Sequence, residues 1–292
     1  ATMLAVLDSR DIVALDLSAP DELRGGVYSL RGVRRTSAQA PLDGATGEAA
    51  LHVLETLVAD LRARAAHPVL GLGIATPGTI DASGTVMTAR SFGWNDLPLR
   101  DIVAARAGVP VTVLNDANAA AVGEQAFAGG PADLLRVQLA VGVGAGLLLG
   151  GQLVIGQSAA VGEIGHLIVD YQGRKCICGR RGCLETWASI PALTRRLAAE
   201  PGRRDEILAE GGRRLGMALV PVLAMLDLDD VVLGGPPALF GGVFTRAAQD
   251  LINERLHSEF RADVRLRPST LGDEATLLGV VAMVLRTTLG VW

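Results

Sequence analysis

The 292-residue chain is poor in aromatic residues and has no long apolar run, and each shortage excludes a class of protein. Phe, Trp and Tyr make up 3% of the sequence, too few to build the stacking platforms that bind single-stranded nucleic acids. No uninterrupted apolar stretch approaches the roughly 18 residues of a membrane span, and the N-terminus lacks the basic and apolar regions of a signal peptide. We therefore expect a cytoplasmic protein without membrane contact.

Basic residues are in no excess over acidic ones. The chain has 27 Lys and Arg against 31 Asp and Glu, which gives a net charge of −4. A DNA-binding surface instead gathers Lys and Arg on one face of a basic protein. Many of the arginines occur as scattered pairs, which we interpret as solvated helix faces: Arg34-Arg35, Arg180-Arg181, Arg195-Arg196, Arg203-Arg204 and Arg213-Arg214.

The apolar content of 49% is enough for a large core, and a chain of this length is expected to form two lobes. Short apolar runs predict strands at 11–17, 25–30, 69–75, 111–114, 134–141, 146–149, 153–155, 231–233 and 264–266. A further strand, the third of the chain, is expected to run through Val33. Helical spacing predicts helices at 47–66, 117–128, 190–199, 205–226, 237–257 and 275–289. This order indicates an α/β protein with two similar halves. The predicted division is an N-terminal extension at 1–10, a small lobe at 11–114 joined by the C-terminal helix within 275–292, and a large lobe at 115–274.

All three cysteines lie within eight positions, at Cys176, Cys178 and Cys183, and His166 stands ten residues before the first. Three thiolates and one imidazole form a complete ligand set for a tetrahedral structural zinc site. An odd number of clustered thiols does not suit a disulfide framework, and it fits a reducing compartment. The alternative is a core histidine beside three reduced cysteines. We predict a zinc loop over residues 166–185.

The region around the cysteines resembles the signature of the ROK family, which groups bacterial sugar kinases and sugar-responsive transcriptional regulators. The matching stretches are residues 162–166 (Gly-Glu-Ile-Gly-His) and 176–185, and there is further likeness at 76–81, 93–94, 115–120 and 234–235. The resemblance extends from about residue 11 to residue 289. It implies the actin-like (ribonuclease H-like) fold of two-lobed ATPases and sugar kinases, with a central cleft.

The resemblance also implies a set of sugar-binding residues. Asn115, Asp116, Glu163, His166 and Glu185 match the positions that hydrogen-bond sugar hydroxyls in the family. Asp116 further matches the catalytic base of the kinases, which takes the proton from the attacking hydroxyl. The alternative for Asp116 is a helix N-cap, and for the two glutamates it is an exposed loop carboxylate.

Two more residues are assigned to effector binding on the same resemblance. Gly78 lies in the matching stretch 76–81. Ser91 stands where family members often carry an asparagine that contacts the sugar, so the ligand is expected to differ from the common hexoses.

The two glycine-rich hairpins that cradle ATP phosphates in kinases of this fold are degenerate here. The first should read Asp-x-Gly-Gly-Thr, but residues 16–22 contain no glycine, one proline without an N–H, and two carboxylates after the first aspartate. The second, at 140–144, has lost its first glycine and its hydroxyl residue. The Gly234-Gly235 pair, which matches the nucleotide-base segment, is followed by two prolines. We therefore expect neither ATP nor Mg²⁺ as a cofactor.

The leading hypothesis is the sugar-sensing effector domain of a ROK transcriptional regulator, which binds a carbohydrate without phosphorylating it. Such a domain is expected to form a homodimer or a higher homo-oligomer. It would contact DNA only through a segment missing from this chain, because residues 1–10 are too few for a DNA reader. One alternative is an ATP-dependent sugar kinase that uses Asp116 as its base. Another is a scaffold homologue that binds no small ligand.

Overall fold

In the computed structural model, which describes residues 9–259 and 263–290, the chain forms two compact units. Unit 1 contains the described residues up to Gly130, then Ile155–Ala160 and the chain from Glu274 onward. Unit 2 contains Pro131–Val154 and Val161–Asp273. This division differs from the predicted boundary at residue 115, because helix α3 (Asp116–Ala128) belongs to unit 1. The predicted N-terminal extension lies almost wholly outside the described residues.

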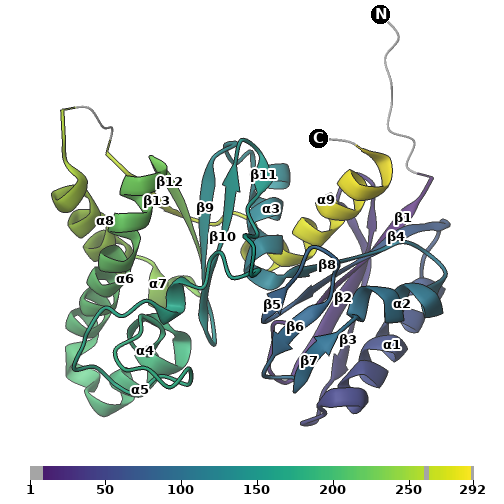
Figure 1. The fold of residues 1–292 in the computed structure, drawn as a ribbon, viewed down its shortest axis with the longest axis horizontal. Helices are drawn as coiled ribbons and strands as arrows, with labels where there is room; N and C mark the ends of the chain where they lie inside the picture. The colour runs from purple at the N-terminus through teal and green to yellow at the C-terminus, as the bar shows by residue number, and fades with distance from the viewer. Residues whose placement is uncertain (1–8, 260–262, 291–292) are drawn as a thin grey trace, which may run out of the picture. The chain divides into compact units, whose positions relative to one another are not determined.

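Unit 1 is built on a five-stranded sheet with the strand order β3-β2-β1-β4-β8 (Figure 1). Its strands are β1 (Asp11–Asp16), β2 (Glu22–Ser29), β3 (Arg34–Pro41), β4 (Val69–Thr76) and β8 (Val111–Asn115). The first three strands pair antiparallel, and β1, β4 and β8 pair parallel. Strand β1 is buried along its whole length, as expected where helices cover both faces of a sheet.

Helices cover this sheet on both faces. Helices α1 (Gly47–Ala63) and α2 (Leu99–Ala107) share one apolar core with the strands, and α1 buries a stripe of residues at helical spacing. Helix α9 (Ala275–Leu289) packs on β1, β4 and β8, and also against α3. A small second sheet of unit 1 contains β5 (Thr79–Ile80), β6 (Val86–Ala89) and β7 (Trp94–Leu97).

Helices α3 and α9 approach each other unusually closely through glycine. A methyl group on Gly123 would overlap the carbonyl oxygen of Ala275, and one on Gly279 would overlap that of Ala119. Only glycine permits this approach of the two backbones. Because α3 begins at Asp116, helix α9 directly supports the element that carries this predicted sugar-binding residue.

Unit 2 repeats the same strand plan, with the order β11-β10-β9-β12-β13. Its strands are β9 (Leu134–Leu139), β10 (Val143–Leu149), β11 (Gln152–Leu153), β12 (Asp230–Gly234) and β13 (Arg265–Pro268), and its longer helices are α5 (Ile190–Ala199), α6 (Arg204–Leu226) and α8 (Val243–Leu256). The first three strands pair antiparallel and the last two join in parallel, as in unit 1. The predicted α/β class with two similar halves is therefore confirmed. None of the helices in the described residues is long and apolar enough to span a bilayer.

Several predicted elements needed correction. The third strand expected through Val33 is present but begins one residue later, as β3, and Val33 itself is 63% exposed. The helix expected at 237–257 is two helices, α7 (Pro237–Phe240) and α8, divided at Gly241 and Gly242, the latter with φ of +53°. Helix α2 and the sheet of β5 to β7 were missed, because their segments are short and weakly patterned.

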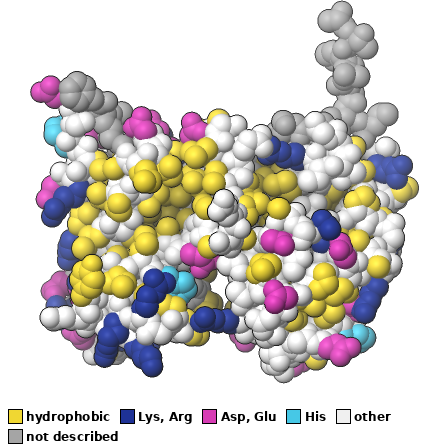
Figure 2. Space-filling model, viewed as in Figure 1, with side chains coloured by type: hydrophobic (Ala, Val, Ile, Leu, Met, Phe, Trp, Pro, Cys, Tyr) yellow, Lys and Arg dark blue, Asp and Glu magenta, His cyan; other side chains and the backbone are white. Residues whose placement is uncertain are grey.

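The arginine pairs are not simply solvated helix faces as predicted. Arg34 and Arg35 lie in β3, where they form ion pairs with Glu274 and Asp11. Residues 180–181 lie in a loop rather than in a helix. On the face drawn in Figure 2, side chains of both charges are scattered rather than gathered into one field.

Candidate metal centre and effector-binding residues

The four predicted metal ligands come together in unit 2. His166 ends the short 3-10 helix η1 (Ile164–His166), and the cysteines lie on the loop that leads to α4 (Glu185–Ala188). One ligand atom from each residue lies within 4.8 Å of all the others. The Cys176 Sγ atom is 3.5 Å from His166 Nδ1, and the Sγ atoms of Cys178 and Cys183 are 3.6 Å apart.

These distances match a tetrahedral zinc site. With Zn–S bonds of about 2.3 Å and a Zn–N bond of about 2.0–2.1 Å, a regular tetrahedron places two sulfur ligands about 3.8 Å apart and a sulfur and a nitrogen about 3.6 Å apart. The donor set, three thiols and one imidazole, is also the one that zinc prefers over harder cations. Two of the contacts in the cluster therefore already have the spacing of zinc ligands, and the four residues could hold a zinc ion.

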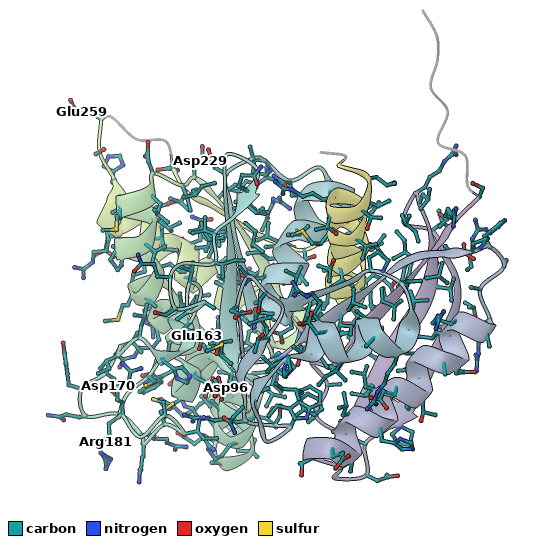
Figure 3. The ribbon with its side chains drawn as sticks, turned by 45° about the vertical axis from the view of Figure 1, so that its right-hand side comes forward. Asp96, Glu163, Asp170, Arg181, Asp229 and Glu259 are labelled. Atoms are coloured by element: carbon teal, nitrogen blue, oxygen red, sulfur yellow. The ribbon has the colours of Figure 1, made fainter. Side chains whose placement is uncertain are left out.

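Glycine lets the loop fold tightly around the cluster. The Cys176 N–H donates to Arg180 O (2.8 Å), and the Gly182 N–H donates to Arg174 O (2.9 Å). Gly182 has φ of +72°, and a methyl group there would overlap the carbonyl oxygen of Asp170. Asp170 and Arg181 mark the course of this loop in Figure 3.

The three thiols differ in acidity. A hydrogen bond from the Arg180 backbone lowers the pKa of Cys178 to about 6. Burial, followed by hydrogen bonds with the neighbouring cysteines, raises the pKa of Cys183 to about 12, and burial also raises the pKa of Cys176. Because thiolate is the form that binds a metal, Cys178 is the ligand best prepared for it, and the buried pair depends on the cation for ionisation.

Two carboxylates lie beside the cluster. Glu163 is 46% exposed and points an oxygen toward His166, with 3.9 Å between Oε2 and the ring Nε2. Glu185 begins α4 and is partly buried, with Oε1 3.9 Å from Cys176 Sγ. His166 therefore turns Nδ1 toward the thiols and Nε2 toward Glu163, so its two ring nitrogens face different side chains.

Asn115 and Asp116 form a second polar group, in unit 1. Asn115 ends β8 and caps α3, because its Oδ1 accepts from the Asn118 N–H (3.1 Å). Its Nδ2 donates to Gly78 O (2.9 Å) and to Asp116 Oδ1 (2.9 Å). The N-cap that the sequence suggested as an alternative for Asp116 is therefore Asn115, and Asp116 is the first residue of the helix.

Gly78 is held in a conformation that favours glycine. Its φ is +97°, and a methyl group would overlap the Thr88 carbonyl oxygen in the neighbouring strand β6. Ser91 lies in the exposed turn that joins β6 to β7. The structure thus brings Gly78, Asn115 and Asp116 into one hydrogen-bonded group, and it places Ser91 on the same unit without a hydrogen bond to that group among the described residues.

The ROK family model matches residues 30–287. The chain belongs to the ROK family. A putative xylose repressor from Caldicellulosiruptor sp. (strain Rt8B.4) is 31% identical over 278 residues, which is 82% of this chain and 70% of the repressor. A glucokinase from Streptomyces coelicolor is 38% identical over 156 residues, which is 51% of this chain and 49% of the kinase.

The fold agrees with that of solved ROK proteins. A ROK transcriptional regulator described as a homologue of the E. coli MLC protein superposes with a TM-score of 0.87 at 22% identity, covering 96% of this chain and 80% of that chain. The actin-like fold expected from the sequence is therefore confirmed. Curated relatives include both repressors and glucokinases, and three other xylose repressors match over 62% to 63% of their own length.

The first hairpin of this ROK chain is closed by its own side chains. The Asp16 carboxylate is 1% exposed and accepts from the Ser18 N–H (2.9 Å) and the Ser18 Oγ–H (2.6 Å). Arg24 on β2 forms an ion pair with the other oxygen of Asp16 at 2.6 Å. The carboxylate at the start of the hairpin is thus neutralised and hydrogen-bonded within the hairpin.

The second hairpin also faces a carboxylate. Glu185 Oε2 accepts from the Val143 N–H at 3.4 Å, where β10 begins. A methyl group on Gly142 would come within 3.0 Å of the same oxygen. No local pattern at 140–144 indicates that Glu185, 42 residues beyond Val143, lies against this hairpin.

A cation–π brace beside the metal loop was also missed. The guanidinium groups of Arg196 and Arg214 lie 4.9 Å and 4.5 Å from the centre of the Trp187 ring, and both arginines pair with Glu210. Arg214 also donates to the Val169 carbonyl oxygen of the metal loop (2.7 Å). The two arginines were interpreted as solvated, because ring contacts between distant helices leave no local pattern in a sequence.

Proposed function

We propose that this chain is the sugar-responsive effector domain of a ROK transcriptional regulator, and that it binds a carbohydrate without transferring phosphate to it. The curated relatives named xylose repressors support the regulatory class. The observation that favours a regulator over a kinase is the hairpin that begins at Asp16, which is hydrogen-bonded to itself. A phosphate-binding hairpin needs free backbone N–H groups, whereas here the Ser18 N–H is already bonded to Asp16, Pro20 has no N–H, and Asp21 and Glu22 add two carboxylates.

Sugar recognition is proposed for the polar groups of both units. In unit 2, Glu163 and Glu185 offer carboxylate oxygens, and His166 offers Nε2 on the side away from the thiols. In unit 1, Asn115, Asp116 and the backbone at Gly78 offer a carboxamide, a carboxylate and a fixed turn. Such groups pair with the adjacent hydroxyls of a sugar ring.

Zinc is proposed as the structural ion of this domain, held by His166, Cys176, Cys178 and Cys183. The ion would fix the loop and, together with the neighbouring hydrogen bonds, the orientation of the His166 ring. A reduced thiol cluster favours the cytoplasm as the location. Homo-oligomer formation and DNA binding by the whole protein belong to the same proposal, and the aligned region spans only 62% to 70% of the xylose repressors.

The test separates ligand binding from phosphate transfer. Purified protein is titrated calorimetrically with xylose, glucose and N-acetylhexosamines, and is separately incubated with ATP, Mg²⁺ and each sugar while nucleoside diphosphate is measured. The proposal expects saturable binding of a sugar and no diphosphate above a sugar-free control. Sugar-dependent turnover that disappears in an Asp116→Asn variant would overturn it.

The second candidate function is a sugar kinase, and one observation favours it. Asp116 stands at the first position of α3, where the positive end of the helix dipole stabilises a carboxylate, and Asn115 Nδ2 holds one of its oxygens. This arrangement would suit a base that accepts a hydroxyl proton. The same incubation with ATP decides between the two functions.

A further inference from the structure

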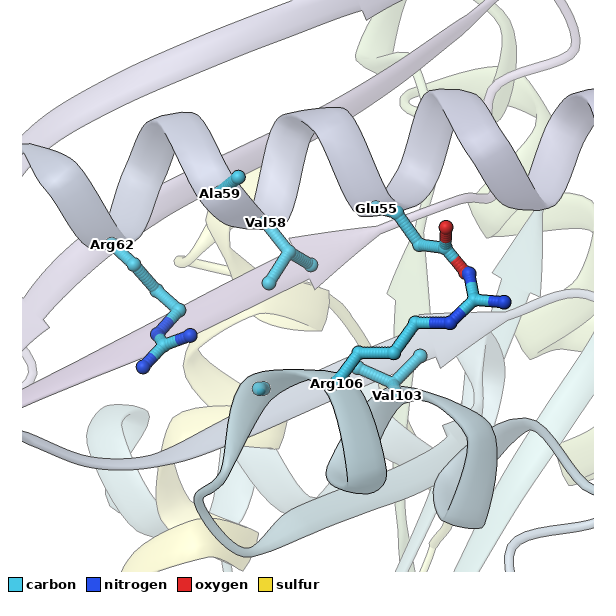
Figure 4. Close-up of a pocket in the computed structure, with 7 residues that line it drawn as sticks. Glu55, Val58, Ala59, Arg62, Val103 and Arg106 are labelled. Carbon is cyan, nitrogen blue, oxygen red and sulfur yellow. The ribbon is translucent and has the colours of Figure 1, made fainter.

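A cavity of about 150 Å³ lies within unit 1, between helices α1 and α2 (Figure 4). Its lining comes only from these two helices: Glu55, Val58, Ala59, Arg62, Val103, Arg106 and Ala107. None of them belongs to the metal cluster or to the polar groups assigned to sugar binding. The cavity therefore needs its own explanation.

One wall carries Arg62, a cation to which the described residues supply no counter-charge. The Nε atom of Arg62 is shielded from solvent and has no hydrogen-bond partner among the described residues. Figure 4 shows its side chain reaching from α1 toward α2 at one end of the cavity. The helix dipole favours an arginine in the last turn of α1. It does not explain why a buried nitrogen of this guanidinium group has no hydrogen-bond partner among the described residues.

The opposite wall is electrically balanced. Arg106 on α2 forms an ion pair with Glu55 on α1, and both line the cavity. Arg62, Arg106 and Glu55 together therefore leave one uncompensated positive charge. That charge matches a singly charged anion better than a doubly charged phosphate.

The floor between these walls is apolar. Val58 is 6% exposed, Val103 is 2% exposed and Ala107 is 6% exposed. An apolar floor with one charged group at its end is the usual composition of a site for a small organic molecule that carries one charge. A carboxylate can accept two parallel hydrogen bonds from the N–H groups of a guanidinium group.

We propose that this cavity is a second ligand site, which binds a small organic monocarboxylate with its carboxylate on Arg62 and its hydrocarbon part on Val58 and Val103. The site goes beyond the proposed sugar-sensing function, since it shares no residue with it. A carboxylate metabolite bound here would act on the same unit that carries Asn115 and Asp116.

The experiment uses sodium benzoate as the probe and benzyl alcohol as its uncharged counterpart, each titrated into the whole chain by calorimetry. The proposal expects saturable benzoate binding and no saturable binding of benzyl alcohol. Arg62→Met should weaken benzoate binding about tenfold or more, since the charge-assisted hydrogen bonds are lost. The matched control is Arg213→Met, which removes an exposed arginine of α6 and should leave benzoate affinity unchanged.

A second variant makes the test independent of Arg62. Ala59 lies on the exposed rim of the cavity, and Ala59→Leu keeps the helix propensity of α1 while filling the opening. It should abolish benzoate binding and leave sugar binding unchanged, which separates this proposal from the proposed function. Absence of saturable benzoate binding to the unaltered chain would overturn the proposal, and so would equal benzoate affinity in Arg62→Met or Ala59→Leu.

Discussion

Replacement of Cys178 by serine is the perturbation with the widest consequences for the proposed domain. Cys178 is the thiol with the lowered pKa, and its Sγ lies 3.6 Å from that of Cys183. A serine hydroxyl is a poor zinc ligand at neutral pH, so the variant keeps the loop sequence and loses the tetrahedral set. We expect the variant to purify without zinc.

The magnitude follows from mass action. An ion that binds the folded chain with free zinc at about 1,000 times its Kd stabilises the fold by about 4.1 kcal/mol. At roughly 2–4 °C per kcal/mol, loss of the ion should lower Tm by about 8–16 °C. The loop that loses its anchor includes Glu185, whose Oε1 is 3.9 Å from Cys176 Sγ, so sugar affinity should fall together with zinc content.

The assay combines metal analysis, thermal unfolding and sugar titration on the same protein samples. Arg181→Ala is the matched control, because Arg181 is an exposed residue of the same loop and not a ligand. The control should retain zinc, Tm and sugar affinity. A metal-free Cys178→Ser protein with the Tm and sugar affinity of the unaltered chain would refute the link between the metal loop and the sugar-binding residues.

Three further predictions address the carboxylates, the helix packing and a buried phenol. Glu163→Ala should weaken sugar binding about 10- to 100-fold with zinc retained, the effect of losing a hydrogen bond to a charged group; unchanged affinity by calorimetry would remove Glu163 from the site. Gly279→Ala should destabilise the fold by about 1–3 kcal/mol in urea unfolding, because its methyl group overlaps the Ala119 carbonyl oxygen, whereas Gly202→Ala meets no atom within 4 Å and should be near neutral. Tyr28→Phe removes a 2.8 Å hydrogen bond to Glu274 and should cost about 1.5–3 kcal/mol at pH 7. Burial, and then Glu274, raises the pKa of Tyr28 above its unfolded value of about 10, so above this pH the folded state retains a proton that the unfolded state loses. The difference in free energy of unfolding between the unaltered chain and Tyr28→Phe should therefore shrink as pH rises above about 10. A difference that stays constant with pH would contradict this account.

The candidate metal centre was predictable from sequence because its four residues are chemically distinctive and nearly contiguous. Cys176, Cys178 and Cys183 are all the cysteines of the chain, so their spacing carries almost the whole geometry of the site. His166 joins them through η1 and the loop that follows it. A tight loop leaves few ways to arrange such close neighbours, which is why a local pattern was sufficient.

Long-range features were not predictable for the opposite reason. The Trp187 brace joins α4, α5 and α6, and each of its arginines is indistinguishable in sequence from a solvated surface residue. Helix α2 is only nine residues long and buries three of them, so its apolar pattern is too short to predict a helix. The cavity between α1 and α2 depends on the distance between these two helices. That distance cannot be predicted from the sequence of either helix alone.

The two degenerate hairpins show how the sequence and the structure support the same conclusion by different routes. From the sequence, missing glycines indicate that backbone N–H groups cannot approach a phosphate. The structure adds that the N–H groups of Ser18 and Val143 already donate to carboxylates, Asp16 in one hairpin and Glu185 in the other. In the first hairpin, glycines alone would still leave Pro20 without an N–H and the carboxylates of Asp21 and Glu22 beside the loop. The proposed absence of phosphate binding therefore rests, in the first hairpin, both on the missing glycines and on the residues that stand in their neighbourhood.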